Sequence, residues 1–382
     1  MAFFLEKFLY PFFFRSFPKV FKILSFFLSS LNAVLVLIVP YYTLGIHNVD
    51  PLCGTVLIGC SITWFLKLVS FHHVLYDIRS CIKQKAILQL AAIHKSYPEF
   101  LNFFDYYTYL IMPTLCFQFH YPRTNSIRWT SVLRHFGQMF FFFILIKIVI
   151  EQYMVVILQN TFVSVDIFKQ MSVLHIFLHL SERILNLSVP NLCVWLLMFF
   201  ILFHHWLNIL AEITYFADRD FYGDWWNSSS FDEYWRKWNR PIHNFFARHL
   251  HKPLLSKGQF NFLTRFNKIY FFKLFLGLSR FVSGQIIFII SALAHEYLVV
   301  VPLRLGWTGL VFTGFIAQVP LIYITSKPLF KKYPIIGNAL FWVVFCFTGQ
   351  PLAILFYYYL WGVQHGKVEH VSVSNIHKIR FI

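Results

Sequence analysis

Long, uninterrupted apolar runs decide what this chain can fold into. Runs of about 20 apolar residues recur, and they lack the alternation of a membrane β-strand. Hydrophobic residues make up 58% of the 382 residues and charged residues only 13%, which is about half the charged fraction of a typical soluble protein. The sequence therefore predicts an all-α polytopic membrane protein with about eight to nine transmembrane helices.

Hydropathy places the individual spans along the chain. The clear crossings are expected near residues 20–45, 52–71, 136–158 and 189–213, around His295, and near residues 307–325 and 335–360. Residues 106–119 are apolar but short and contain Pro113, so this segment is expected to enter or lie on the membrane without crossing it. For residues 160–188 the sequence leaves open whether a further short hairpin is present. Without internal repeats or a second soluble region, residues 1–382 are interpreted as one domain.

Lysine and arginine orient these spans. Basic residues before the first span predict a short cytoplasmic N-terminus at residues 1–19, followed by a signal anchor and not a cleavable signal. The polar segment 218–270 is expected to be a cytoplasmic loop, and residues 364–382 a short tail. The net charge of +17 fits either this topology or an anionic substrate. Because the basic residues lie between hydrophobic spans, nucleic acid is not expected as a partner.

Metal and nucleophile signals are weak. The six cysteines form no CxxC pair, so neither a disulfide framework nor a zinc site is indicated. His175 and His179 have helical i,i+4 spacing with Glu182 beyond, which fits a metal site but fits a surface amphipathic helix better. The spacing from His72 to Asp77 matches a glycerolipid acyltransferase pair, although the other blocks of that family are missing and we interpret it as coincidence. No metal is expected.

An ionisable pair lies inside one apolar run. His295 and Glu296 follow Ile286–Ile290, and ionisable groups in hydrocarbon usually face a cavity or a partner. A lone histidine is more often a packing residue, but the adjacent glutamate and the preceding basic loop favour chemistry here. A zinc-protease helix is excluded because Val299 occupies the position of its second histidine.

The predicted cytoplasmic loop carries tryptophans interleaved with basic residues. They occur in the block Phe221–Asn227 and again between Tyr234 and Arg240. Two interpretations stay open from composition alone. The tryptophans could form a membrane-interface belt, or they could form a platform on which a flat anionic ligand stacks and is neutralised.

The block Phe221–Asn227 reads Phe-Tyr-x-Asp-Trp-Trp-Asn, which is long and specific. Together with Trp238–His243, His295–Arg304 and Gly349–Pro351, it resembles the membrane-bound O-acyltransferase superfamily, in the branch of diacylglycerol and sterol O-acyltransferases. Within that branch the pattern is most similar to the type 1 diacylglycerol O-acyltransferases, over about residues 65–361. The basic N-terminal extension usual there is nearly absent, and residues 253–284 look longer than expected.

The resemblance implies helices around an intramembrane reaction chamber in the endoplasmic reticulum membrane. It implies transfer of a fatty acyl group from acyl-CoA to diacylglycerol, making triacylglycerol, with no cofactor beyond the acyl-CoA co-substrate, and a homodimer or homotetramer. His295 would be the base, Asn239 its polar partner and Glu296 a supporting residue. The residues expected to bind acyl-CoA are Trp225, Trp226, Asn227, Arg236, Lys237, Arg240, His243 and Lys252, and those for the acceptor are Gln318 and Gln350.

Two other functions remain. A sterol O-acyltransferase would share the fold and His295 but would make steryl esters. A polytopic transporter or receptor could use the His295–Glu296 pair as a proton relay, which leaves the tryptophan-rich block without a role.

Overall fold

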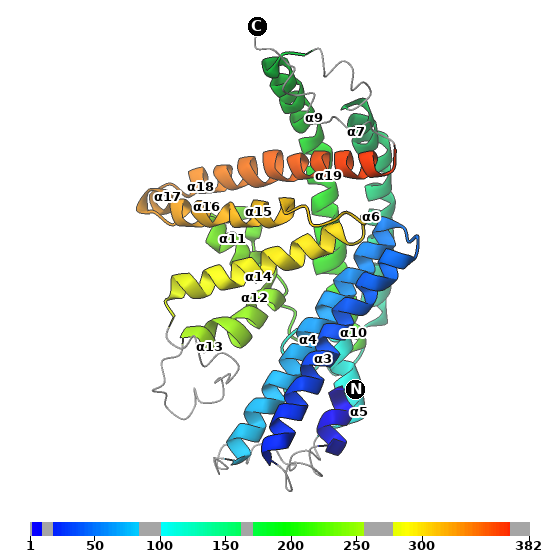
Figure 1. Ribbon diagram of the computed structural model, residues 1–382, viewed down its shortest axis with the longest axis vertical. Coiled ribbons are helices and arrows are strands. Elements are labelled where there is room, and N and C mark those ends of the chain that lie inside the picture. The colour runs from blue at the N-terminus through cyan, green and yellow to red at the C-terminus, as the bar shows by residue number, and fades with distance from the viewer. Residues whose placement is uncertain (1, 10–17, 84–100, 162–170, 256–277, 367–382) are drawn as a thin grey trace. The chain divides into compact units, whose positions relative to one another are not determined.

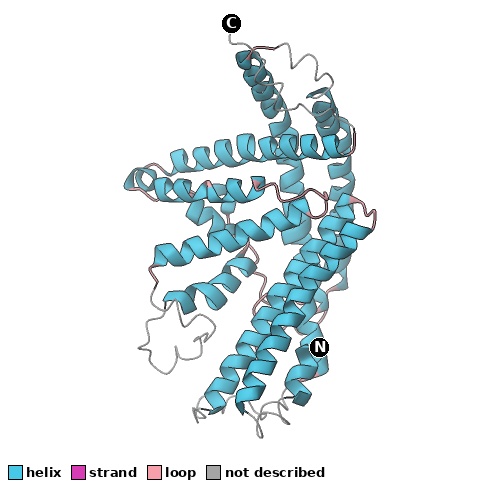
Figure 2. Cartoon of the chain, in the orientation of Figure 1, coloured by secondary structure: helices cyan, strands magenta, loops and turns pink. Residues whose placement is uncertain are grey.

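The computed structural model describes residues 2–9, 18–83, 101–161, 171–255 and 278–366. These residues form helices and loops (Figures 1 and 2), with one isolated antiparallel bridge between Arg123 and Phe216. The predicted all-α class is confirmed. Of the predicted cytoplasmic loop, residues 256–270 lie outside the described part, as do residues 367–382 of the predicted tail.

Six of the described helices are long and apolar enough to cross a membrane. They are Ile23–Ile46, Pro51–Ile78, Trp129–Thr161, Val173–Ile213, Arg280–Val300 and Pro334–Gln364. The expected crossing at 307–325 is instead a pair of short helices, α15 (Leu310–Ile316) and α16 (Gln318–Thr325). Together they cover roughly 24 Å, less than the ~30 Å hydrocarbon layer. The predicted number of eight to nine spans is therefore only approximate.

The chain divides into two compact units, of which the first contains Met1–Ile127, Leu210–Asp220 and Asn239–Trp307. Its long helices α3 and α4 form an antiparallel hairpin (Figure 1), and α14 packs against α4 and η6. The elements of this unit are α1 (Ala2–Phe4), η1 (Leu5–Leu9), α3 (Pro18–Ile46), α4 (Pro51–Lys83), α5 (Phe103–Ile111), α12 (Arg240–Phe246), η6 (Ala247–His251), α13 (Lys252–Leu255) and α14 (Arg280–Val300).

A buried lysine fixes the short helix α5 in this unit. The ammonium group of Lys67 on α4 donates to the carbonyl oxygens of Tyr109 at 2.8 Å and Met112 at 2.5 Å. In return, the Tyr109 hydroxyl donates to the Lys67 carbonyl at 3.0 Å. The helix ends at Ile111, directly before Pro113, so the prediction of a short, interrupted segment is confirmed. Because all these groups are paired, a charged residue is accommodated inside an apolar span.

The second unit contains Arg128–Ile209, Phe221–Trp238 and Thr308–Ile382. Its elements are α6 (Trp129–Val149), η3 (Ile150–Met154), α7 (Val155–Thr161), α9 (Val173–Phe199), η4 (Phe200–Trp206), η5 (Trp225–Asn227), α11 (Phe231–Trp238), α15, α16, α17 (Pro328–Lys332), α18 (Pro334–Phe341), η9 (Trp342–Gly349) and α19 (Gln350–Gln364). Helix α10 (Leu207–Ile213) includes residues of both units. The expected crossing at 189–213 begins earlier than predicted, at Val173.

Three of the long helices contain a π-helical segment with α-helix on both sides. These segments are η3, η4 and η9, and each lies inside one of the candidate membrane spans. Lys147 at the end of α6 pairs with Glu151 of η3 at 3.8 Å, as their i,i+4 spacing predicts. Single π-helical turns inside α-helices occur often at functional sites, which directs attention to the side chains that they carry.

Candidate functional site

His295 lies in the last third of α14, on a helix that Ser279 caps by accepting a hydrogen bond from the Val282 amide. Its Nδ1 lies 2.7 Å from the Ser291 carbonyl oxygen, one turn earlier. A carbonyl oxygen can only accept, so Nδ1 carries the proton and the basic lone pair is on Nε2. This contact assigns Nε2 of His295 as the nitrogen that can accept a proton.

The end of α14 is anchored to the α3–α4 hairpin. The Tyr297 hydroxyl donates to the Leu37 carbonyl at 2.7 Å, and the Arg304 guanidinium donates to Asn48 and to the His47 carbonyl. Arg304 has φ of 55°, a left-handed conformation that is uncommon for a residue with a side chain. These contacts fix the position of His295 relative to α3 and α4.

Glu296 is fully buried in the helix next to His295. An ionised carboxylate is costly in such a place unless other groups stabilise it. Adjacent helical residues are about 100° apart around the axis, so Glu296 faces a different direction from His295. Its predicted supporting role remains a prediction.

Asn239 is the N-cap of α12. Its side-chain oxygen accepts a hydrogen bond from the Ile242 amide at 3.1 Å, which leaves the Nδ2 group as the donating end of the side chain. The next residue, Arg240, pairs with Asp220. The cap orients the Asn239 amide, and an amide that donates is the form needed to stabilise an oxyanion.

Helix η6 covers the first half of α14. Nδ1 of His251 lies 2.8 Å from the Ser283 hydroxyl, and Ser283 precedes His295 by about 18 Å along the helix. In the same segment His249 is buried, and Ser70 Oγ lies 2.8 Å from its Nε2. Burial, together with His73 and the nearby Arg248 charge, lowers the pKa of His249 to about 2. His249 is therefore neutral at any physiological pH.

Two of the residues expected to bind acyl-CoA, His243 on α12 and Lys252 on α13, are exposed in the first unit. Of the pair His72 and Asp77, interpreted as coincidence, Asp77 lies 3.7 Å from His73, and His72 lies 3.2 Å from Ser29 on α3.

Trp225 of the block Phe221–Asn227 lies in a hydrophobic core cluster of the second unit. Trp225 is 1% exposed, and its ring lies against Trp195, Phe199 and Trp238 at centroid distances of 5.0, 5.1 and 5.0 Å. Trp195 and Trp238 are stacked, 4.9 Å apart with 5° between their planes. Neither open interpretation describes Trp225, because its faces are covered by protein. Trp226, by contrast, is 42% exposed.

Close backbone contacts hold this block against α18. The side-chain amide of Asn338 donates to the carbonyl oxygens of Trp226 at 2.8 Å and Ser228 at 3.0 Å. A Cβ on Gly337 would lie 1.9 Å from the Ser229 carbonyl oxygen, so only glycine fits there. Asn227, expected to bind acyl-CoA, is exposed beside these contacts.

The basic residues of α11 are paired with carboxylates. Lys237 donates to Asp224 at 2.7 Å and to Glu233 at 2.8 Å. Burial alone would lower the pKa of Lys237, but these two partners raise it above its usual value. Arg236 lies 3.2 Å from Asp232 with both side chains exposed. An exposed pair contributes only about 0–1 kcal/mol, so Arg236 can exchange its partner for a phosphate more readily than Lys237 can.

The two glutamines expected on the acceptor side have similar surroundings. The Gln318 side-chain oxygen accepts from the Trp235 indole at 3.1 Å, and that of Gln350 accepts from Asn191 at 3.0 Å. Because each oxygen is already used, the amide nitrogens are the ends that donate, and that of Gln318 already donates to the Gly314 carbonyl at 3.5 Å. Asn191 itself was not predicted, since an asparagine in an apolar run gives no positional signal.

Sequence reasoning also missed a cluster of three histidines in the second unit, His135, His204 and His205. The available signal was the adjacent pair in an apolar span, where polar side chains are functional candidates by default. The third member lies in another helix and has no sequence spacing that connects it to the pair.

Comparison with known proteins identifies the family. The profile of the membrane-bound O-acyltransferase family matches residues 20–264. Similar curated proteins include Diacylglycerol O-acyltransferase 1 of Corylus americana, 37% identical over 82% of this chain and 54% of the relative. Those of Arabidopsis thaliana and Chlorocebus aethiops are 37% and 36% identical over 80% and 82% of this chain, and 52% and 58% of their own lengths.

The chain belongs to the membrane-bound O-acyltransferase family and is a multi-pass membrane protein. It spans little more than half of each relative named above.

Proposed function

We propose that this chain is an acyl-CoA:diacylglycerol O-acyltransferase that makes triacylglycerol in the endoplasmic reticulum membrane, with its N-terminus in the cytoplasm. The observation that carries the proposal is the hydrogen bond from His295 Nδ1 to the Ser291 carbonyl, which leaves the basic lone pair on Nε2 in an apolar helix. The relatives named as diacylglycerol O-acyltransferases support the choice of reaction.

The proposed reaction uses His295 first as a base and then as an acid. The acceptor hydroxyl attacks the thioester carbonyl carbon of acyl-CoA as its proton passes to Nε2, because an alcohol is a poor nucleophile while it keeps that proton. The new C–O bond forms a tetrahedral oxyanion, to which the oriented Asn239 amide donates. The C–S bond then breaks, and CoA leaves as a thiol after receiving the proton from Nε2. The thioester is already activated, so the scheme needs no metal and no other cofactor.

The other proposed roles follow from which groups can donate. For acyl-CoA we propose the exposed Trp226, Arg236, Lys252 and His243, with Asn227, Lys237 and Arg240 as further polar contacts, and Trp225 as the packed base of its block. For the acceptor we propose the amide nitrogens of Gln318 and Gln350, which suit the ester carbonyls of a glyceride. For the oligomeric state we propose a homodimer or a homotetramer.

The test is an acyltransfer assay with purified protein in lipid nanodiscs. Labelled acyl-CoA is offered with 1,2-diacylglycerol, cholesterol or ergosterol as the acceptor. Buried amides left unpaired by a sterol cost roughly 1–3 kcal/mol each, so we expect diacylglycerol to react at least about tenfold faster. Gln350→Leu should erode that preference without weakening acyl-CoA binding.

Other outcomes of this assay identify the alternatives. Abundant steryl ester with little triacylglycerol would make the protein a sterol O-acyltransferase. Proton-coupled flux without consumption of acyl-CoA would indicate a transporter and overturn the proposal.

A further inference from the structure

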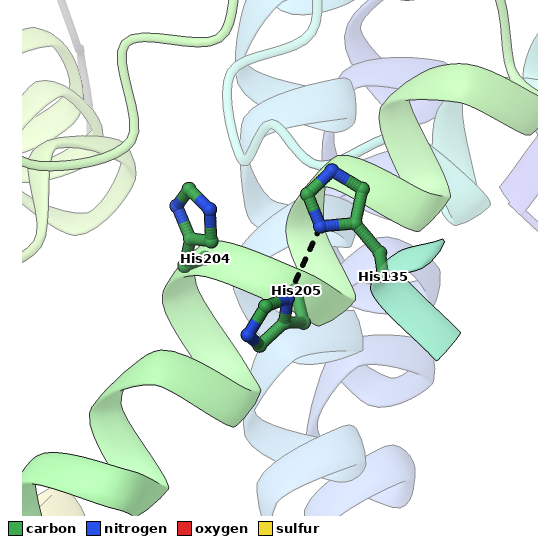
Figure 3. Close-up of side chains that lie close together, drawn as sticks. All are labelled: His135, His204 and His205. Atoms are coloured by element: carbon green, nitrogen blue, oxygen red, sulfur yellow. Dashed lines mark hydrogen bonds between the residues drawn. The ribbon is translucent and has the colours of Figure 1, made fainter. Parts of the chain in front are cut away.

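Three histidines from two helices of the second unit surround a common space (Figure 3). His135 lies on α6, whereas His204 and His205 are consecutive residues of the π-helical segment η4, which packs against α6. One nitrogen from each ring lies within 4.8 Å of the other two, and Nδ1 of His135 is 3.1 Å from Nδ1 of His205.

This spacing is close to that of ligands around one metal ion. Zinc–nitrogen bonds are 2.0–2.1 Å long and tetrahedral, which places two ligating nitrogens about 3.3 Å apart. The His135–His205 pair already has nearly this separation, and a nitrogen of His204 lies within 4.8 Å of both. Neutral imidazole is the commonest protein ligand for such ions.

A second set of contacts orients the third ring. The Tyr222 hydroxyl lies 2.8 Å from Nδ1 of His204, which assigns Nε2 of that ring to the common space. Metal-binding histidines almost always have their other ring nitrogen held in this way.

The three histidines differ in exposure. His205 is 4% exposed and lies against Phe142, with ring centroids 5.4 Å apart. His135 and His204 are only half-buried, so an ion can reach their nitrogens. Tetrahedral sites with three histidines and one open position are a common form of zinc site.

The alternative is a packed histidine pair without an ion. It accounts for the His135–His205 hydrogen bond, but not for the third ring and its tyrosine partner at the same point. The two residues of η4 also lie in the wider turn of a π-helix, a distortion that occurs often at functional sites.

We propose that His135, His204 and His205 bind a Zn²⁺ ion through three imidazole nitrogens, with a fourth position left open. The ion would connect α6 to η4 and thereby stabilise the second unit. The proposal does not depend on the acyltransferase activity, because none of the three histidines has a role in the proposed reaction.

The test measures metal binding to the full chain in nanodiscs, purified through an affinity tag that contains no histidine. After chelator treatment, Co²⁺ is added as a spectroscopic substitute and Zn²⁺ is titrated in competition. We expect the strong visible absorption of tetrahedral Co²⁺ and about one Zn²⁺ bound per chain. Tyr222→Phe should weaken binding by roughly 10–100-fold, and His205→Phe should weaken it further.

Matched controls separate this site from general histidine binding. His175→Phe and His179→Phe change the i,i+4 pair on α9 and should leave the spectrum and the affinity unchanged. If His205→Phe does not give folded protein, judged by size-exclusion chromatography, the half-exposed His135→Phe takes its place. Absence of the tetrahedral spectrum in the unmodified protein, or equal loss in the His175→Phe control, would overturn the proposal.

Discussion

The helix around His295 and the tryptophan-rich block both drew attention from sequence, but the structure places them in opposite kinds of environment. His295 is half-buried, and its proton is fixed by the Ser291 carbonyl. Trp225 is covered by other aromatic rings, and Lys237 is paired with two carboxylates. Residue type alone marks both regions as unusual. Their difference in burial and in bonding partners is visible only in the structure.

The largest expected effect is on catalysis at His295. His295→Ala removes the proposed base and should lower kcat by about 10²–10⁴-fold. The thermal midpoint should change little, because only a half-buried side chain is lost. The contacts of Tyr297 and Arg304 that hold the end of α14 remain. His175→Ala is the control and should keep full activity. If His295→Ala retained more than a tenth of the activity, the assignment of the base would be wrong.

For the tryptophan block we expect a loss of stability, where His295→Ala is expected to lose activity. Trp225→Ala removes a fully buried ring and should cost about 3–5 kcal/mol of unfolding free energy, seen as lost yield and a lower melting temperature in nanodiscs. The matched change, Trp226→Ala, affects an exposed ring and should leave stability nearly unchanged. A raised KM for acyl-CoA in a normally stable Trp225→Ala protein would contradict this packing role.

A pH effect on stability is expected in the first unit. In the folded state the pKa of His249 is lowered to about 2, whereas its unfolded value is about 6.5. Between these values the unfolded chain binds more protons, so stability is lost as the pH falls below about 6.5, by up to about 1.4 kcal/mol per unit. Melting temperatures measured from pH 7.5 to 5 should fall less steeply for His249→Gln than for the unmodified protein.

The exposed His175→Gln variant is the control for that measurement. It should follow the unmodified curve, since His175 is exposed. Parallel curves for all three proteins would show that His249 does not govern the acid sensitivity.

The smallest expected effect is a difference between substitutions of two neighbouring basic residues, Arg236 and Lys237. Arg236→Ala breaks one exposed ion pair, costs at most about 1 kcal/mol, and should mainly raise the KM for acyl-CoA if the side chain contacts a phosphate. Lys237→Met leaves Asp224 and Glu233 without their shared partner and should lower the melting temperature by more than Arg236→Ala does. Equal KM values for Arg236→Ala and the unmodified enzyme would remove Arg236 from the acyl-CoA site.

The sequence was reliable where one local property decides the structure. The all-α class, the break before Pro113 and the Lys147–Glu151 pair follow from hydropathy, proline geometry and helical spacing. The segment expected to cross at 307–325 is apolar as predicted, but its two helices α15 and α16 are shorter than the predicted span. For the tryptophan block, both interpretations placed the rings at a surface, either at the membrane interface or against a ligand. The basic residues beside the block suggested a surface, and the sequence does not show which helices cover Trp225.

The sequence by itself determined that this is a helical membrane protein of the membrane-bound O-acyltransferase family, and that His295 is its main catalytic candidate. These conclusions rest on composition and on contiguous motifs, which need no tertiary contact. Only the tertiary structure decided the burial of Trp225 and the meeting of His135 with His204 and His205. Each of these depends on groups that lie on different turns or helices, and their separation in space is set by packing, not by their order in the chain.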